Sequence, residues 1–522
     1  MSHKLVTFFL CLIIGLGFFI RITLTAHYPL WLDEQFSLLF SWSRTPFELL
    51  IQNRDVHPGL SYIFLKGLLV FTSNLFVLRL LLSVLPQLLG GVCVLWWVRK
   101  QQWATSAVLF LAVTLFLDPF FVFTGIHLRM YGLVCLIASL TYIALKSFQQ
   151  DRSKKYLLMV IALLLLGNAI SYAFFFLTLG VVAWLVADDL KEKTFRHWPA
   201  IALSILSLGE FFLLAGFSVK RQFEEASWIP IPGFFNIPSL FFTLLGFETN
   251  YFLGPVSLSL ATVLFYLAIA ASLVLIFQKK KKPLFWTSSF DLGALVVLPC
   301  LLIVSISLVM PFLSQRFFFY QFLPRLSLFL PRLFTPILVM FFCTSAEVIN
   351  RKIRERALPV FKVSVGLLLG LTSVFWVRSY VEIWKTTINL QRKEAQKIEF
   401  LKKEQVEVGE TLESSNIILL PSWSWLTLLN TNNLDELPAI MSRSNESAQF
   451  ESELVARPLI SCSSLQQKKI IFLKNQTAYT VSSYYQNGER NIEHCCRKET
   501  ENDASSSWLC SNDVSTEPSS SQ

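Results

Sequence analysis

Charged residues are scarce in this chain of 522 residues, because Asp, Glu, Lys and Arg together make up only 15% of it. Soluble domains carry about 25% charged residues, so a chain with this composition could not cover a water-exposed surface of ordinary size. Its hydrophobic content of 54% also excludes an intrinsically disordered chain. The composition therefore predicts an α-helical multi-pass membrane protein with a smaller polar part.

Acidic residues are the scarcer of the two charged kinds, since 35 Asp and Glu face 45 Lys and Arg, a net charge of +10. Such an excess can mark a nucleic-acid-binding protein. Here, however, the basic residues lie in short clusters between apolar runs, which is typical of cytoplasmic loops. We therefore expect the lipid bilayer, and no nucleic acid, as a partner of the chain.

Histidine is also scarce, with six residues, and none is spaced to form a zinc site with the cysteines near the carboxyl terminus. Those cysteines are Cys462, Cys495, Cys496 and Cys510. In an oxidising compartment such an even set could form disulfides, with three connectivities left open.

Long apolar runs follow one another through most of the chain. A spanning helix needs about 20 mostly apolar residues, and about eleven runs meet this requirement. We predict spans near residues 5–25, 75–98, 103–119, 127–147, 156–170, 172–187, 198–218, 254–277, 291–313, 326–345 and 359–377. Basic clusters follow the even-numbered spans, which predicts a cytoplasmic amino terminus and a carboxyl-terminal part outside.

Residues 1–377 form the predicted membrane domain. Its first outer loop contains apolar stretches near 46–52 and 59–71 that are too short or too broken to span a bilayer. We interpret them as amphipathic helices on the membrane surface.

Residues 378–522 turn polar and predict a small α/β extracytoplasmic domain. Strand-like segments lie near 416–420 and 469–473. A Ser-rich stretch from about Ala504 predicts a disordered end.

Two adjacent carboxylates, Asp33 and Glu34, follow the first predicted span. Adjacent like charges raise the pKa of one of the pair, which suits a proton acceptor or a metal ligand. The alternative is that both acids simply favour the amino terminus of a helix. A divalent metal at Asp33 and Glu34 is a further hypothesis that the sequence leaves open.

Further polar residues lie beside the same predicted membrane face. Asp55 and His57 precede Pro58, which predicts a helix start with a carboxylate and an imidazole at its positive end; Asp55 could also be an N-cap alone. Arg129, with Tyr131 two residues later, opens the predicted fourth span, where its guanidinium could bind a phosphate or extend to lipid headgroups.

These motifs, in this order, resemble a known family. They are Trp31-Leu32-Asp33-Glu34, Asp55-Val56-His57-Pro58, Leu78-Arg79-Leu80 with Ser83, Arg129-Met130-Tyr131 and, later, Pro324-Arg325. The chain resembles the GT-C membrane glycosyltransferases of the family-39 group, which contains protein O-mannosyltransferases and the aminoarabinose transferase of lipid A. Two departures from the family pattern are Gly59, where a second Pro is frequent, and Leu326, where a Tyr is usual.

The resemblance implies a GT-C fold and the transfer of a sugar from a polyprenyl-phosphate donor to an extracytoplasmic acceptor. In that reading Asp33 deprotonates the acceptor, and Glu34 takes the second acidic place. Asp55, His57 and Tyr131 flank the site, and Arg129 and Arg325 hold the carrier phosphate.

The chemistry would be a single displacement with inversion, because one base and fixed cations suffice for it. Two other functions compete with this one: a lipid or glycan transporter (flippase), and a non-catalytic membrane assembly subunit. We expect the chain to lie in a bacterial plasma membrane.

Overall fold

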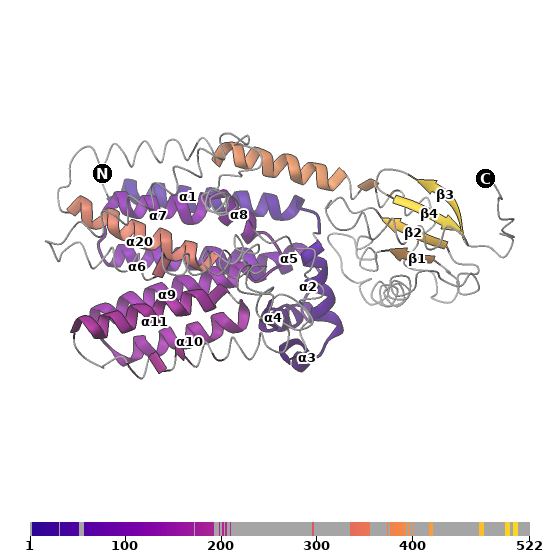
Figure 1. Ribbon diagram of the computed structural model, residues 1–522. Helices are drawn as coiled ribbons and strands as arrows, with labels where there is room; N and C mark the ends of the chain where they lie inside the picture. Colours follow the sequence, from indigo (N-terminus) through magenta and orange to yellow (C-terminus); the bar gives the residue numbers. More distant parts are fainter. Residues whose placement is uncertain are drawn as a thin grey trace, which may run out of the picture. The chain divides into compact units, whose positions relative to one another are not determined.

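The computed structural model describes residues 3–30, 32–51, 57–171, 173–192, 335–354 and 376–392, four short strands with Cys496 near the carboxyl terminus, and a few single residues. The described part is mostly helical, as the composition predicted (Figure 1). The chain divides into two compact units. The first unit contains residues 1–26, 44–65 and 79–384, and the second contains residues 27–43, 66–78 and 385–522.

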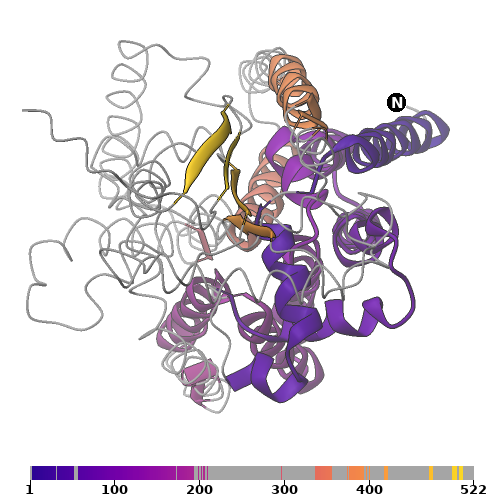
Figure 2. The same cartoon turned by 90° about the vertical axis from the view of Figure 1, so that its right-hand side faces the viewer.

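The first unit is a helical bundle. Its helices are, wholly or for most of their length, α1 (His3–His27), α3 (Pro46–Ile51), α4 (Leu60–Leu69), η1 (Leu80–Val84), α6 (Leu85–Lys100), α7 (Thr105–Leu117), α8 (Pro119–Gly125), α9 (Tyr131–Asp151), α10 (Lys154–Ile170), α11 (Ala173–Glu192) and α20 (Thr335–Arg354). Helix α9 packs against α6, α10 and α20, and α7 packs against α6 and α20. Figures 1 and 2 show these helices side by side.

Glycines allow close approaches in this bundle. A Cβ atom on Gly90 of α6 would lie 2.9 Å from the Cα of Leu136 in α9, and one on Gly132 of α9 would lie 1.9 Å from the carbonyl oxygen of Ser83 in η1. Small residues at helix interfaces are the usual means by which membrane helices approach each other. Gly132 thus brings the start of α9 against η1, a single π-helical turn between α5 (Leu75–Arg79) and α6.

Three helices of the described part are long and apolar enough to cross a membrane: Lys4–His27, Leu75–Lys100 and Tyr131–Asp151. The pair α7 and α8, bent by 46°, makes a fourth if it counts as one span. The chain is therefore a helical membrane protein. The predicted total of eleven spans stays a prediction, because most of residues 193–334 and 355–375 lie outside the described part.

Two predicted helix boundaries differ from the structure by a few residues. Helix α9 begins at Tyr131, and not at His127 as predicted. The run predicted to be helical over 103–119 breaks at Asp118, whose backbone is extended (φ −62°, ψ 123°) because Pro119 disfavours a helical conformation in the residue before it. The Asp118 carboxylate accepts a hydrogen bond from the backbone amide of Phe121 (2.9 Å), so it caps α8.

An ion-pair cluster joins α9 to α20. The ammonium of Lys146 lies 2.9 Å from a carboxylate oxygen of Glu347, and Arg351 lies 2.6 Å from the other oxygen. One turn away in α20, the side-chain oxygen of Asn350 accepts a hydrogen bond from the amide of Ala104, at the start of α7 (2.7 Å). Because Lys146 is buried, the cluster fixes the register of α20 against α9.

The second unit contains α2 (Leu32–Ser43), most of α5, and a four-stranded sheet. The ammonium of Lys66 donates hydrogen bonds to the carbonyl oxygens of Ser41 (3.1 Å) and Trp42 (3.2 Å) and so caps the end of α2. The side-chain amide of Gln391 donates to the carbonyl oxygen of His27 (2.5 Å), which ties residues 385–392 to the segment that leads into α2.

The sheet has the strand order β1-β2-β4-β3. Its strands are β1 (Ile417–Leu420), β2 (Lys469–Leu473), β3 (Arg497–Glu501) and β4 (Ser505–Leu509). Strands β1 and β2 pair in parallel, and the other two pairs are antiparallel.

Strands β1 and β2 confirm the two strands predicted from the sequence. Strand β4, however, occupies the start of the Ser-rich stretch that was predicted to be disordered, so that prediction was wrong for Ser505–Leu509. Cys496, directly before β3, is in a disulfide whose partner lies outside the described residues. That this part of the chain lies in an oxidising compartment stays a prediction.

Candidate active site

Three of the predicted site residues come together in the first unit. His57, Arg129 and Tyr131 are all buried. The imidazole ring of His57 meets the ring of Tyr131 edge to face, with 6.4 Å between the ring centroids. The structure thus joins a residue from the segment before α4 with one from the first turn of α9.

The turn between α8 and α9 holds Arg129 through its backbone. The amide of Arg129 donates a hydrogen bond to the carbonyl oxygen of His127 (2.7 Å), which tightens the turn. The hydroxyl of Ser83 in η1 donates to the carbonyl oxygen of Arg129 (2.8 Å). Ser83 belongs to the motif that carried the family resemblance, and Gly132 allows it to lie directly against the start of α9.

The side chain of Arg129 is held by Tyr62, which the sequence analysis did not assign to the site. Its Nη1 atom donates a hydrogen bond to the Tyr62 hydroxyl (2.9 Å), and both side chains are buried. Helix α4 buries Ser61, Tyr62 and Leu65, so its spacing alone indicates an inward-facing hydroxyl at position 62. The pairing with Arg129 could not be read from the sequence, because 67 residues separate the two.

Gly59 lies at a place that is too narrow for a larger residue. A Cβ atom at this position would lie 1.8 Å from the carbonyl oxygen of Leu49 in α3. The ring of a proline would meet the same atom. Gly59 therefore allows α3 to pack directly against the start of α4, and this contact fixes the segment that presents His57.

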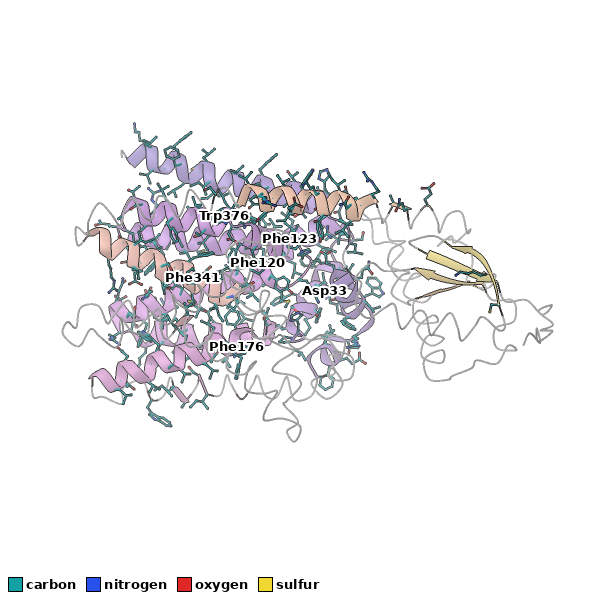
Figure 3. All side chains as sticks on the ribbon, turned by 45° about the horizontal axis from the view of Figure 1, so that its top comes forward. Asp33, Phe120, Phe123, Phe176, Phe341 and Trp376 are labelled. Carbon is teal, nitrogen blue, oxygen red and sulfur yellow. The ribbon has the colours of Figure 1, made fainter. Side chains whose placement is uncertain are left out.

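The two predicted carboxylates lie in the first turn of α2, in the second unit. Glu34 is fully buried and Asp33, labelled in Figure 3, is half-buried. The Ser37 hydroxyl donates to the carbonyl oxygen of Asp33 (2.9 Å). The first turn of a helix stabilises ionised carboxylates. That Asp33 and Arg129 face one common cavity stays a prediction, because they belong to different units.

The remaining predicted site residues, Asp55 and Arg325, lie outside the described residues. Within the described part, no three His, Cys, Asp or Glu side chains gather closely enough to hold a metal ion. The hypothesis of a metal at Asp33 and Glu34 would need ligands from elsewhere in the chain, from substrate or from water.

Aromatic side chains surround the turn that carries Arg129. The ring of Phe123 in α8 meets the imidazole of His127 edge to face at 4.7 Å, and Phe121 meets Phe342 of α20 at 6.0 Å. Phe120, Phe123 and Phe341 are labelled in Figure 3 and are only partly buried. Arg129 itself is buried, so the charge of its guanidinium is screened far less than it would be in water.

In sum, the first unit presents a fixed guanidinium, a phenol and an imidazole at the end of the bundle where α9 begins. Such a set can bind an anionic group such as a phosphate and stabilise charge that develops on it. No family model matches this chain, and a comparison with curated proteins finds no significant match either.

Proposed function

We propose that the chain is a membrane glycosyltransferase that takes a sugar from a polyprenyl-phosphate donor and passes it to an acceptor outside the cytoplasm. The proposal rests first on the ordered motifs that resemble the GT-C glycosyltransferases. The observation that carries it furthest is the buried Arg129, which Tyr62 and Ser83 hold from two sides.

A fixed cation is what this reaction requires at its leaving group. When the bond between the anomeric carbon and the phosphate oxygen breaks, negative charge grows on the polyprenyl phosphate. A guanidinium that is already oriented stabilises this charge without reorganising. In the proposal Arg129 takes this role, and Arg325 supports it. His57 and Tyr131 line the pocket for the phosphate and the sugar, and Asp55 flanks them.

The acceptor hydroxyl must lose its proton as it attacks the anomeric carbon. We propose that the carboxylate of Asp33 accepts this proton. Glu34 is the second acidic residue of the same motif. One base and one displacement invert the anomeric configuration and leave no covalent link between sugar and protein. The anomer of the product, read by NMR, should therefore be opposite to that of the donor.

The direct test uses the purified chain in lipid nanodiscs with a panel of polyprenyl-phosphate sugars. Release of polyprenyl phosphate, in the presence of membrane extract as the acceptor source, measures transfer. We expect Asp33→Asn to lower the rate by about 100- to 10,000-fold, the usual contribution of a general base.

The matched control is Glu48→Gln, because Glu48 pairs with Thr45 at the start of α3 and has no part in the proposed chemistry. This variant should transfer sugar at the wild-type rate. Undiminished transfer by Asp33→Asn, at equal protein level, would show that another group is the base.

A transporter is the second candidate, and one observation favours it. The α7–α8 pair is a broken helix with buried polar residues, a feature of many transporters. Two polar groups at the break are, however, used within the protein, because the Phe116 carbonyl accepts from Arg21 and the Asp118 carboxylate accepts from the amide of Phe121. A transporter would move the lipid-linked sugar across the bilayer of a proteoliposome without releasing polyprenyl phosphate, so the two functions differ in their product.

A further inference from the structure

Arg21 lies inside α1, a candidate membrane span, and is fully buried. A buried arginine in a membrane span is costly unless its donors are used by polar partners. Its Nε atom donates a hydrogen bond to the side-chain oxygen of Gln87 in α6 (2.7 Å). Its Nη1 atom donates to the carbonyl oxygens of Gly17 (3.0 Å) and Phe116 (2.8 Å).

The partners of Arg21 on α7 are carbonyl groups that the helix break has left without helical donors. Pro119 has no amide hydrogen, so the carbonyl of Leu115, four residues earlier, cannot make its usual bond. Nη2 of Arg21 lies 3.5 Å from this oxygen. The carbonyl of Leu117, the last residue of α7, accepts instead from the Tyr380 hydroxyl (2.8 Å). Where water cannot reach such carbonyls, side chains must supply the missing donors.

The same cluster also fixes α8, the helix after the break. The side-chain nitrogen of Gln87 donates to the carbonyl oxygen of Phe121 (2.6 Å). At the other end of α8, a Cβ atom on Gly125 would lie 2.0 Å from the side-chain oxygen of Gln87, which is the oxygen that Arg21 binds. The side chain of Gln87 therefore contacts α8 near its start, at Phe121, and at its end, at Gly125. Arg21 orients this side chain through its own hydrogen bond to it.

Helix α1 packs closely against the end of α7 beside the Arg21 guanidinium. A Cβ atom on Gly17 would lie 2.6 Å from the Phe116 carbonyl oxygen, so α1 and the end of α7 are in direct contact beside the guanidinium. His127 and Arg129 follow α8 by only two and four residues. Any shift of α8 is thus passed on to the turn that carries them.

We propose that Arg21 is a positioning residue, which by holding the broken end of α7 and the side chain of Gln87 fixes α8 and the turn that presents His127 and Arg129. It does not itself touch the donor. Only the activity test of this role depends on the proposed function. The structural role of Arg21 is inferred from its contacts alone.

The structural test is hydrogen–deuterium exchange of the full chain in nanodiscs, with Arg21→Met as the variant. We expect the amides of residues 121–131 to exchange about tenfold faster or more, because local opening of α8 becomes easier, while residues 154–170 of α10 stay unchanged. Arg152→Gln is the matched control, since Arg152 pairs with Asp188 elsewhere in the unit, and it should leave exchange in residues 121–131 at the wild-type rate.

The activity test separates positioning from general damage. With a donor that the wild type consumes, Arg21→Met should raise the donor KM about tenfold or more and lower kcat much less, since the base is untouched. Arg21→Lys should recover part of the lost donor affinity, because its ammonium can still donate to some of the acceptors. The recovery should be incomplete, because the ammonium reaches fewer of them than the guanidinium does.

Unchanged exchange in residues 121–131, or an equal rise in residues 154–170, would overturn the proposal. If Arg21→Met cannot be isolated, Gln87→Met decides, because it removes the bond to Phe121 and one bond to Arg21; it should raise the same exchange by a smaller factor. If the wild type transfers no sugar from any donor, the proposed function fails, while the exchange experiment still tests Arg21.

Discussion

At the scale of single residues, Tyr62 and Ser83 restrict Arg129 from two sides. Ser83 holds its backbone carbonyl and Tyr62 holds its guanidinium. A side chain fixed in this way loses little conformational entropy when it binds an anion, and preorganisation of this kind is a main source of binding affinity.

Removing the Tyr62 hydroxyl should therefore weaken donor binding. We expect Tyr62→Phe to raise the donor KM about tenfold, because the hydrogen bond to a charged group is lost, with little change in kcat or in thermal stability. Steady-state kinetics with increasing donor measure both constants. Tyr156→Phe, on the partly exposed start of α10, is the control and should behave as wild type. An unchanged KM in Tyr62→Phe would mean that Tyr62 does not orient Arg129.

Gly132 should resist any larger side chain. An alanine there places its Cβ 1.9 Å from the Ser83 carbonyl oxygen, and overpacking of this kind costs about 1–3 kcal/mol. Gly15 of α1, whose Cβ would meet nothing within 4 Å, provides the matched control. Thermal unfolding in detergent should show Gly132→Ala clearly less stable, and Gly15→Ala as stable as wild type or slightly more. Equal stability of the two variants would contradict the close approach of α9 and η1.

The sequence indicated part of this site and missed the rest for a physical reason. Arg129 stood out because an arginine near an apolar run is costly unless it has a use, and His57 and Tyr131 stood out through the motifs that contain them. Tyr62 and Arg21 could not be assigned, because their roles depend on partners 67 and 66 residues away. A lone arginine within the first apolar run was the one signal that could have pointed to Arg21.

At the scale of elements, short helices were predicted better than their interruptions. Helices α3 and α4 fall within the apolar stretches 46–52 and 59–71, where short helices were predicted. The break between α7 and α8 was missed because the apolar composition continues through Asp118 and Pro119. The start of α9 was placed too early because polar residues such as His127 and Arg129 can also lie in the first turn of a helix, and only their backbone contacts show that they form a turn.

The ion pair between α9 and α20 allows a test of element packing. Replacing Glu347 with Gln leaves the buried Lys146 without its carboxylate, and such a loss costs about 3–5 kcal/mol. We expect Glu347→Gln to lower the melting temperature clearly. Asp188→Asn breaks the more exposed pair with Arg152 and should cost only about 1 kcal/mol or less. Similar effects of the two variants would argue against a buried pair.

The stability that Glu347 contributes should also depend on pH. Burial alone would raise the pKa of its carboxyl, but the nearby charges of Lys146 and Arg351 outweigh burial and hold this pKa below its ordinary value of 4.5. A lowered pKa in the folded state contributes stability above the unfolded value, and this stability is lost as pH falls through the folded value. The difference in melting temperature between wild type and Glu347→Gln should thus be constant from about pH 6 to 8 and shrink below about pH 4.

At the scale of the whole molecule, the predicted orientation places the carboxyl-terminal sheet outside the cytoplasm. In spheroplasts that express the chain, a membrane-impermeant maleimide should label the peptide with Cys496 only after an impermeant reductant has opened its disulfide. Cys93, in the span that ends at Lys100, should stay unlabelled with or without the reductant. Labelling of Cys496 only after the membrane is permeabilised would show that the carboxyl-terminal sheet faces the cytoplasm, contrary to the predicted orientation.

The bond between Lys146 and Glu347 also has a consequence for biosynthesis. About 200 residues separate the two, so a ribosome that adds about 5–20 residues per second completes α20 roughly 10–40 s after α9. During that interval the ammonium of Lys146 has to be sheltered by water, headgroups or the insertion machinery. Truncated chains that stop before residue 335 lack this ion pair, so we expect them to be less stable than the full chain and to be degraded faster in cells.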